Sequence, residues 1–231
     1  LLLLITISRR ITGSLNSCQM TWFYWSEYNR DVKIAILSYY SGQVERGVEV
    51  AAEALALRLS AHHDVQLFQA GSKLNPRIKT TILNSESQWH SDSSASPWRY
   101  WYLDYYSRKI LRFTLSFVGC FRKKKYDVII PTNGGWQVLV IRLLTWIYSK
   151  KMMIQGNAGI GRDDGWQLLC RPDVYVAVSP VGYAWAKKNA FGIRIAYIPY
   201  GVDFDQFKDV QPADIPLKKP VVLCVGAFLP Y

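Results

Sequence analysis

The sequence is poor in the residues that build metal centres, disulfide frameworks and histidine-based catalytic sites. Its four cysteines are scattered, with no C-x-x-C pair and no neighbouring histidine cluster. This pattern argues against a zinc site and a disulfide framework, and it predicts reduced cysteines in a cytosolic protein. The only histidines are His62, His63 and His90. None lies where a general base would be expected in the fold inferred below, so we predict no histidine base and no bound metal.

Long apolar runs are lacking as well. The apolar start of the chain reaches only residue 7 before Arg9 and Arg10, well short of the ~20 residues that cross a bilayer. We expect residues 1–30 to be an extension outside the folded domain. Half of the residues are nevertheless hydrophobic, at 50%, which excludes a disordered chain and predicts a globular protein.

Short apolar runs alternate with stretches of helical periodicity from residue 33 to residue 198. The stripe formed by Tyr106, Ile110, Phe113 and Phe117, for example, has spacings of four, three and four. Expected strands cover residues 33–38, 64–70, 79–83, 126–131, 152–155, 174–178 and 194–198. Expected helices cover residues 48–59, 98–121, 136–148, 166–170 and 180–189. This alternation predicts an α/β fold whose parallel sheet is covered on both faces.

Prolines mark the end of this pattern. Pro199 stops the last strand, and residues 203–219 read as a polar, proline-bearing linker. Residues 221–225 then form a β-branched run typical of a buried parallel strand. We therefore expect one domain over residues 31–202 and the first strand of a second domain over 220–231. On this interpretation the chain is a fragment of a longer two-domain protein.

Glycine-bearing loops follow several of the expected strands. In an open parallel sheet such loops meet outside the carboxyl ends of the strands, where helix N-termini offer unpaired N–H groups to an anionic or hydroxyl-rich ligand. They have neither the Lys-Ser/Thr of a P-loop nor a Gly-x-Gly-x-x-Gly fingerprint, and glycines that only allow tight turns are the alternative. The candidate binding residues in these loops are Gly42, Arg46, Gly47, Asn133, Gly134, Gly156 and Asn157.

Asp163 and Asp164 are the one pair of adjacent carboxylates in a loop of this kind. They are suited to accept hydrogen bonds from substrate hydroxyls. Capping the helical turn at Trp166 is an equally good interpretation.

Three segments together resemble a known family. They are Arg46-Gly47-Val48-Glu49, the run from Pro172-Asp173 to Ser179, and the run from Ile198 to Asp203. Along with the acceptor-type loop over residues 156–171, they resemble the N-terminal domain of GT-B glycosyltransferases, family 4 in particular. The resemblance implies a doubly wound, Rossmann-like parallel sheet. Arg46 stands where that family has a glycine and can bind phosphate. Tyr200 stands where it has an asparagine, which weakens a polar role there.

The resemblance implies a retaining enzyme that moves a sugar from a nucleotide diphosphate sugar to an acceptor hydroxyl, with no further cofactor. In that family the leaving diphosphate is thought to take the acceptor proton, so no catalytic residue is assigned here. The donor is held mostly by the second domain, and the fragment alone is expected to be inactive. Two alternatives from other classes are a noncatalytic phosphate- or nucleotide-binding module and a basic nucleic-acid-binding protein.

Positive charge is concentrated in one aromatic-rich segment. The formal net charge is +11, and eight lysines and arginines stand between residues 98 and 125 against Asp104 alone. This mixture suits the anionic surface of a membrane, which would make the protein cytoplasmic with a peripheral membrane contact. Nucleic acid would suit the charge too, but it is not the partner that we expect. An ordinary solvated helix face is the alternative.

Overall fold

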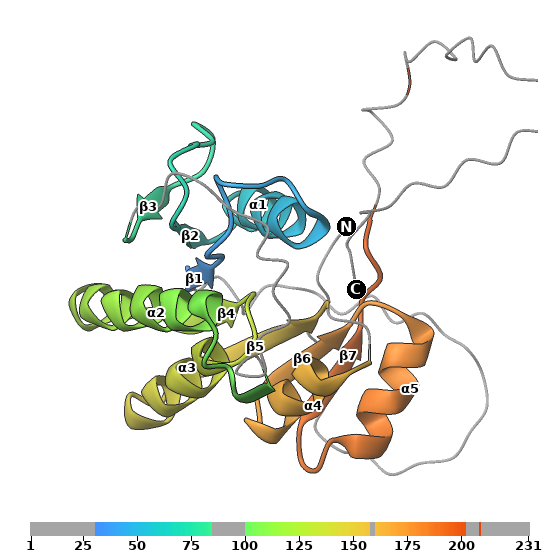
Figure 1. Cartoon of the computed structure of the whole chain (residues 1–231). Coiled ribbons are helices and arrows are strands. Elements are labelled where there is room, and N and C mark those ends of the chain that lie inside the picture. The colour runs from blue at the N-terminus through green and yellow to red at the C-terminus, as the bar shows by residue number, and fades with distance from the viewer. Residues whose placement is uncertain (1–30, 85–99, 158–159, 202–207, 209–231) are drawn as a thin grey trace, which may run out of the picture.

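The computed structural model describes residues 31–84, 100–157, 160–201 and 208, and its strands form one seven-stranded sheet in which every pair is parallel (Figure 1). The strand order is β3-β2-β1-β4-β5-β6-β7. The strands are β1 (Lys33–Leu37), β2 (Asp64–Gln69), β3 (Thr80–Ile82), β4 (Val128–Pro131), β5 (Lys151–Gly156), β6 (Val174–Ala177) and β7 (Arg194–Tyr197). The helices are α1 (Gly47–Leu59), α2 (Tyr105–Lys124), α3 (Trp136–Ile147), α4 (Arg162–Leu169) and α5 (Pro180–Asn189).

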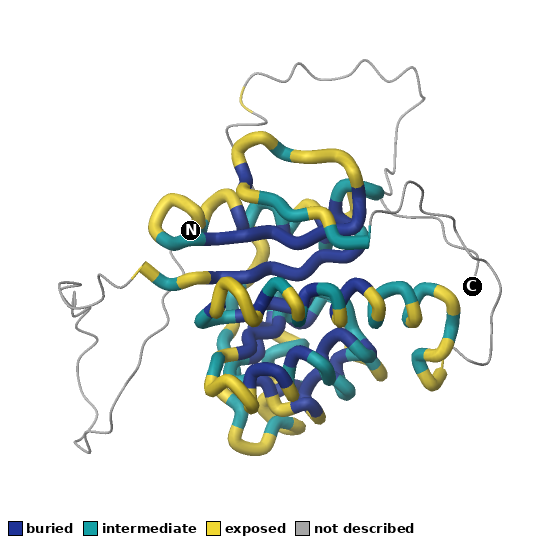
Figure 2. Tube along the Cα trace, turned by 90° about the vertical axis from the view of Figure 1, so that its left-hand side faces the viewer, coloured by how far each residue is buried: buried dark blue, intermediate teal, exposed yellow. Residues whose placement is uncertain are grey.

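The sheet is doubly wound, as the sequence predicts. Among the described helices, α1 packs on one face, where Ala52 and Ala56 meet the side chains of β1 and β2. Helices α2 to α5 pack on the other face, in a larger cluster (Figures 1 and 2). Two-sided cover explains why the central strands are almost uniformly apolar instead of alternating. The two halves of the sheet meet at β1 and β4, paired from Ile34 opposite Val128 to Leu37 opposite Pro131.

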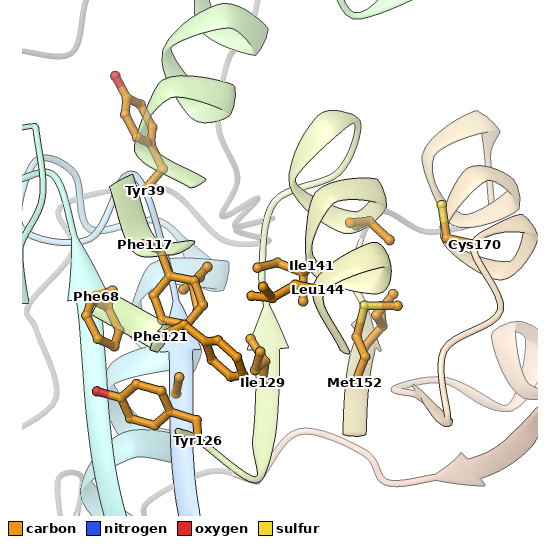
Figure 3. Close-up of a cluster of buried hydrophobic side chains, with 14 of the residues drawn as sticks. Tyr39, Phe68, Phe117, Phe121, Tyr126, Ile129, Ile141, Leu144, Met152 and Cys170 are labelled. Carbon is orange, nitrogen blue, oxygen red and sulfur yellow. The ribbon is translucent and has the colours of Figure 1, made fainter. Parts of the chain in front are cut away.

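Aromatic side chains fill the core between α2 and the sheet (Figure 3). The ring of Phe117 lies 4.8 Å from that of Phe68 on β2 and 6.0 Å from that of Tyr126, centroid to centroid. Phe121 continues this row of rings along the helix. The Tyr126 hydroxyl donates to the buried Gln66 side chain, and burial raises the pKa of this tyrosine. The predicted apolar stripe of α2 is therefore confirmed as its buried face.

Two helix boundaries differ from the sequence prediction. The helix expected over 98–121 is α2 and begins at Tyr105, because Asp104 caps it by accepting from the N–H and hydroxyl of Ser107. Just before the cap, Tyr102 adopts a left-handed conformation with φ of 54°. The turn expected over 166–170 is longer and begins at Arg162 as α4, since acidic residues are favourable in a first helical turn. The remaining elements agree with their predicted positions to within a few residues.

Several predicted segments lie outside the described residues. They are the extension over 1–30, all of the linker over 203–219 except residue 208, the strand over 221–225, and His90. His62 and His63 follow α1 and precede β2, at the amino edge of the sheet. No helix in the described ranges has both the length and the apolar character needed to span a membrane.

Replacing Phe117 with alanine should lower the free energy of unfolding by about 3–5 kcal/mol, because the ring is fully buried and its loss leaves a cavity. Urea denaturation followed by circular dichroism measures the change. Leu115→Ala on the exposed side of the same helix is the matched control and should change it by less than about 0.5 kcal/mol. Equal effects of the two substitutions would contradict the packing of α2 described above.

Candidate functional site

The candidate site lies outside the carboxyl ends of β1 and β4, where the strand order reverses. In open α/β sheets this is the position at which ligands bind. The loops after the two strands are joined: the Asn133 side-chain oxygen accepts the Tyr39 N–H at 3.0 Å. The N–H and hydroxyl of Thr132 both donate to the Leu37 carbonyl, each at 3.0 Å. The Asn133 side chain thus braces the loops and is turned toward β1.

A short aromatic strap, defined here as residues 100–104, crosses the loops that follow β4 and β5. The Tyr102 hydroxyl donates to Asp163 at 2.6 Å, and the Trp136 indole N–H donates to the Tyr102 carbonyl at 2.8 Å. The Trp166 indole N–H donates to the Gly135 carbonyl at 2.9 Å. These bonds tie the strap, the β4–α3 loop and the start of α4 into one structure.

Gly135 must be glycine in this arrangement. Its φ is 60°, and a Cβ atom there would lie 2.7 Å from the Tyr102 ring. Gly134, in contrast, has ordinary space: a Cβ would lie 3.8 Å from the Asp163 side chain. The backbone of the β4–α3 loop therefore approaches both the strap and the α4 carboxylate.

Asp164 is held inside the protein. Its side chain is buried and accepts from the Tyr175 hydroxyl of β6 at 2.7 Å, while its second carboxylate oxygen is buried with no hydrogen-bond partner among the described residues. Burial raises the pKa of Asp164, and the Tyr175 hydroxyl and backbone N–H groups of the preceding loop offset only part of that effect. A Cβ atom on Gly156 would lie 2.0 Å from the same hydroxyl. Asp164 is thus a structural carboxylate that positions the loop.

Asp163 and Arg162 are charged groups at this edge that solvent reaches. Their side chains are 45% and 42% exposed, and Arg162 Nη2 lies 3.5 Å from the Asp163 carboxylate. The Arg162 guanidinium also lies over the rings of Tyr100 and Tyr102, 5.4 and 4.8 Å from their centroids. Burial, with the hydrogen bond to Asp163, raises the pKa of Tyr102 to about 12, so this hydroxyl stays a donor at neutral pH.

The β1–α1 loop carries the other predicted binding residues. Arg46 donates from Nη2 and Nε to the buried Glu49 carboxylate, at 2.8 and 3.3 Å, and lies over the Tyr40 ring at 4.6 Å. A phosphate at Arg46 would therefore have to share the guanidinium with Glu49. Gly42 has a φ of 75°. Gly47 is the first residue of α1, and a Cβ atom at Gly47 would have no atom within 4 Å.

The predicted residues fall into three groups. Gly134 and Asp163 come together at the junction of the β4–α3 and β5–α4 loops, with Gly156 and Asp164 beneath them, whereas the side chain of the neighbouring Asn133 is bonded to the β1–α1 loop. Gly42, Arg46 and Gly47 form the second group, on the β1–α1 loop.

Asn157 forms the third group, a separate contact in which it accepts from the Tyr200 hydroxyl. Tyr200 therefore keeps one polar contact through its hydroxyl, and the weakened polar role inferred from the sequence stays a prediction. Sequence reasoning missed Tyr102 and Tyr175, although the cap at Asp104 offered a signal that Tyr102 lies outside the helix.

Comparison with known proteins identifies similar solved structures, although no protein-family model and no curated protein matches the chain. Sucrose-phosphate synthase from Thermosynechococcus elongatus aligns with a TM-score of 0.54 at 14% identity, over 75% of this chain and 49% of that one. A second structure of this synthase aligns with a TM-score of 0.51 at 15% identity, over 76% of this chain and 92% of that one. HepE from Anabaena, in complex with UDP, aligns with a TM-score of 0.51 at 12% identity, over 76% of this chain and 46% of that one.

The chain therefore spans about half the length of two of these three structures. Identities this low show the fold alone. These neighbours have the GT-B architecture, and the fold of this chain is the Rossmann-like, all-parallel α/β domain found in them.

The raised pKa of Asp164 predicts a pH-dependent effect of Asp164→Asn. In the unfolded chain the carboxyl titrates near 3.8, and in the folded chain it titrates higher, so ionisation destabilises the wild type as pH rises between these values. The free energy of unfolding of the variant should therefore rise relative to that of the wild type over this interval. Urea titrations from about pH 3 to about pH 7 measure the difference.

Asp173→Asn is the matched control with the opposite sign. Burial would raise the pKa of Asp173, but the Met152 N–H, Lys151 and Arg142 outweigh it and hold that pKa below its usual value. The ionised Asp173 carboxylate stabilises the folded wild type. The free energy of unfolding of Asp173→Asn should therefore fall relative to that of the wild type as pH rises toward 3.8. If the free energies of unfolding of both variants, relative to the wild type, changed in the same direction with pH, the burial assigned to Asp164 would be contradicted.

Proposed function

We propose that this chain is the acceptor-side domain of a retaining glycosyltransferase similar to family 4. The whole enzyme would move a sugar from a nucleotide diphosphate sugar to an acceptor hydroxyl in the cytoplasm. The observation that carries the proposal is the half-exposed Arg162–Asp163 pair at the start of α4, on the carboxyl edge of the sheet beside Gly134 of the β4–α3 loop. The family resemblance of the sequence and the names of the structural neighbours support the same reaction class.

Asp163 is the residue best suited to contact the acceptor. One of its oxygens accepts from Tyr102, and the exposed carboxylate has lone pairs left for a sugar hydroxyl. Arg162 lies beside it and can donate to hydroxyl or phosphate oxygens. The backbone of Gly134 lies close to the Asp163 side chain and adds an uncrowded surface for a bound sugar. Asp164 acts through Tyr175 as a positioning residue and does not touch the substrate.

The donor would be held mainly by the second domain that the resemblance implies. A donor with a uridine diphosphate leaving group agrees with the UDP in the HepE complex. In the retaining mechanism of the resembling family, the leaving diphosphate takes the proton of the acceptor. This proposal therefore needs no histidine base from the acceptor-side domain.

The 231-residue chain alone should transfer no sugar, because most of the donor contacts belong to the second domain. The measurement mixes radiolabelled UDP- and GDP-sugars with the purified chain and a panel of sugar acceptors, and a heat-treated sample sets the background. Turnover above that background would contradict both the domain assignment and the proposed inactivity.

Binding of acceptor sugars should nevertheless be measurable on the same chain. In a two-dimensional NMR titration with mono- and disaccharides, we expect the amide signals of Gly134, Gly161 and Asp163 to shift. Asp163→Asn should weaken this binding about tenfold or more, since hydrogen bonds to charged groups contribute about 1.5–3 kcal/mol. Asp127→Asn is the matched control: this carboxylate is 47% exposed but lies before β4, at the opposite edge of the sheet. Shifts that are absent, or that both variants reduce equally, would refute the acceptor site.

A further inference from the structure

Helix α3 lacks the polar outer face that a surface helix normally has. Leu143, Trp146 and Ile147 are 47%, 56% and 74% exposed, at spacings of three and one that place them on one side of the helix. Its one charged residue, Arg142, forms an ion pair with Asp173 at 2.7 Å and lies over the Trp146 ring. A helix that is hydrophobic all round is normally covered on every side, so the outer face of α3 is suited to contact another apolar phase.

Helix α2 lies beside α3 (Figure 1). Its exposed residues include the cations Arg112, Arg122 and Lys123. Their C-terminal ends adjoin, with the rings of Phe121 and Tyr148 5.2 Å apart. The sequence of α2 contains no acidic residue, and Asp127 is the only one between residues 105 and 162. Asp127 is itself paired with Lys150 at 2.8 Å. The α2–α3 surface, as we define it, consists of the exposed residues Arg112, Arg122, Lys123, Leu143, Trp146 and Ile147.

We propose that the α2–α3 surface docks on an anionic membrane. The exposed side chains of α3 would enter the boundary between headgroups and acyl chains, while the cations of α2 lie against anionic headgroups. Trp146 suits this position because its ring is apolar and its N–H remains close to water. The nearby carboxylates of Asp127 and Asp173 are ion-paired, which leaves an excess of positive charge beside the apolar side chains. This excess favours lipid over a second copy of this chain, whose equally basic surface would be repelled.

This surface revises the membrane contact expected from residues 98–125 alone. Within that segment Tyr102 is hydrogen-bonded to Asp163 and Phe121 is buried in the core, whereas Trp101 is 67% exposed. The Lys124 ammonium is hydrogen-bonded to Gln66 at 3.0 Å. We assign the main insertion role to the C-terminal part of α3, where Leu143, Trp146 and Ile147 form one continuous exposed apolar face. Ile147 stands eleven residues after Trp136, about 16 Å along the helix from the candidate site. Docking there would leave the candidate site uncovered.

Cosedimentation of the full 231-residue chain with vesicles tests the proposal. Vesicles of phosphatidylcholine with phosphatidylglycerol should bind the protein, and vesicles of phosphatidylcholine alone should bind it at least tenfold more weakly. Binding should weaken as salt is added, because the attraction acts within a Debye length of about 10 Å at 0.1 M salt. Failure to bind the anionic vesicles at low salt, with the protein folded by circular dichroism, would overturn the proposal.

Matched variants separate insertion from charge. Trp146→Gln with Ile147→Gln should weaken binding about tenfold or more, whereas Phe191→Gln, at an 85% exposed residue after α5, should not change it. Changing Arg112, Arg122 and Lys123 to glutamine should weaken binding about a hundredfold, at about fivefold per cation. The same change at Lys187, Lys188 and Arg194 removes equal charge elsewhere and should have a much smaller effect.

If the two triple substitutions weakened vesicle binding equally, binding would depend on net charge alone, and the assigned surface would be wrong. Light scattering at several protein concentrations measures whether a second copy of this chain binds the α2–α3 surface instead. A dimer that Trp146→Gln with Ile147→Gln converts to monomer would show that a second copy covers α3, and would replace the membrane proposal. These measurements require no sugar transfer, so their outcome is independent of the proposed function.

Discussion

The parallel pairing of β1 with β4 is the constraint on which the other features depend. The chain leaves β1 in one direction to build β2 and β3, then returns to place β4 on the other side of β1. The return requires an element that crosses back over the strands already formed, and α2 is that element. Its buried rings contact Phe68 on β2 and Tyr126 just before β4, so the packing of one helix fixes the position at which the second half of the sheet begins. The two loops joined by Asn133 then lie side by side as a consequence.

Much of this arrangement could be predicted from the sequence. Strands buried on both faces leave continuous apolar runs, and one-sided burial of α2 leaves a stripe of period 3.6, so both were visible without coordinates. The first turn of α4 was not, because Arg162, Asp163 and Gly165 interrupt any apolar period. The start of α2 was missed for the opposite reason: the strap is rich in aromatic residues, which suggested that the helix continued through it.

The candidate site was predictable in its location and less so in its chemistry. The rule that loops gather at the carboxyl ends of parallel strands placed Asn133, Gly134 and Asp163 at one edge. Pairing of individual side chains is a different matter, since Tyr102 reaches Asp163 across 61 residues of sequence. From the sequence alone, Asp163 and Asp164 are equivalent neighbours. Burial separates them, because one side chain points to solvent and the other lies beneath the loop against Tyr175.

The close approach of Gly156 to the Tyr175 hydroxyl also bears on how this domain can diverge. Any side chain at position 156 would displace that hydroxyl, and Asp164 would then lose its side-chain hydrogen bond while remaining buried. Positions 156 on β5, 164 on α4 and 175 on β6 therefore depend on one another physically. A side chain at position 156 requires the tyrosine and the buried acid to be replaced with it, whereas Gly156→Ala alone leaves a buried carboxylate without that hydrogen bond.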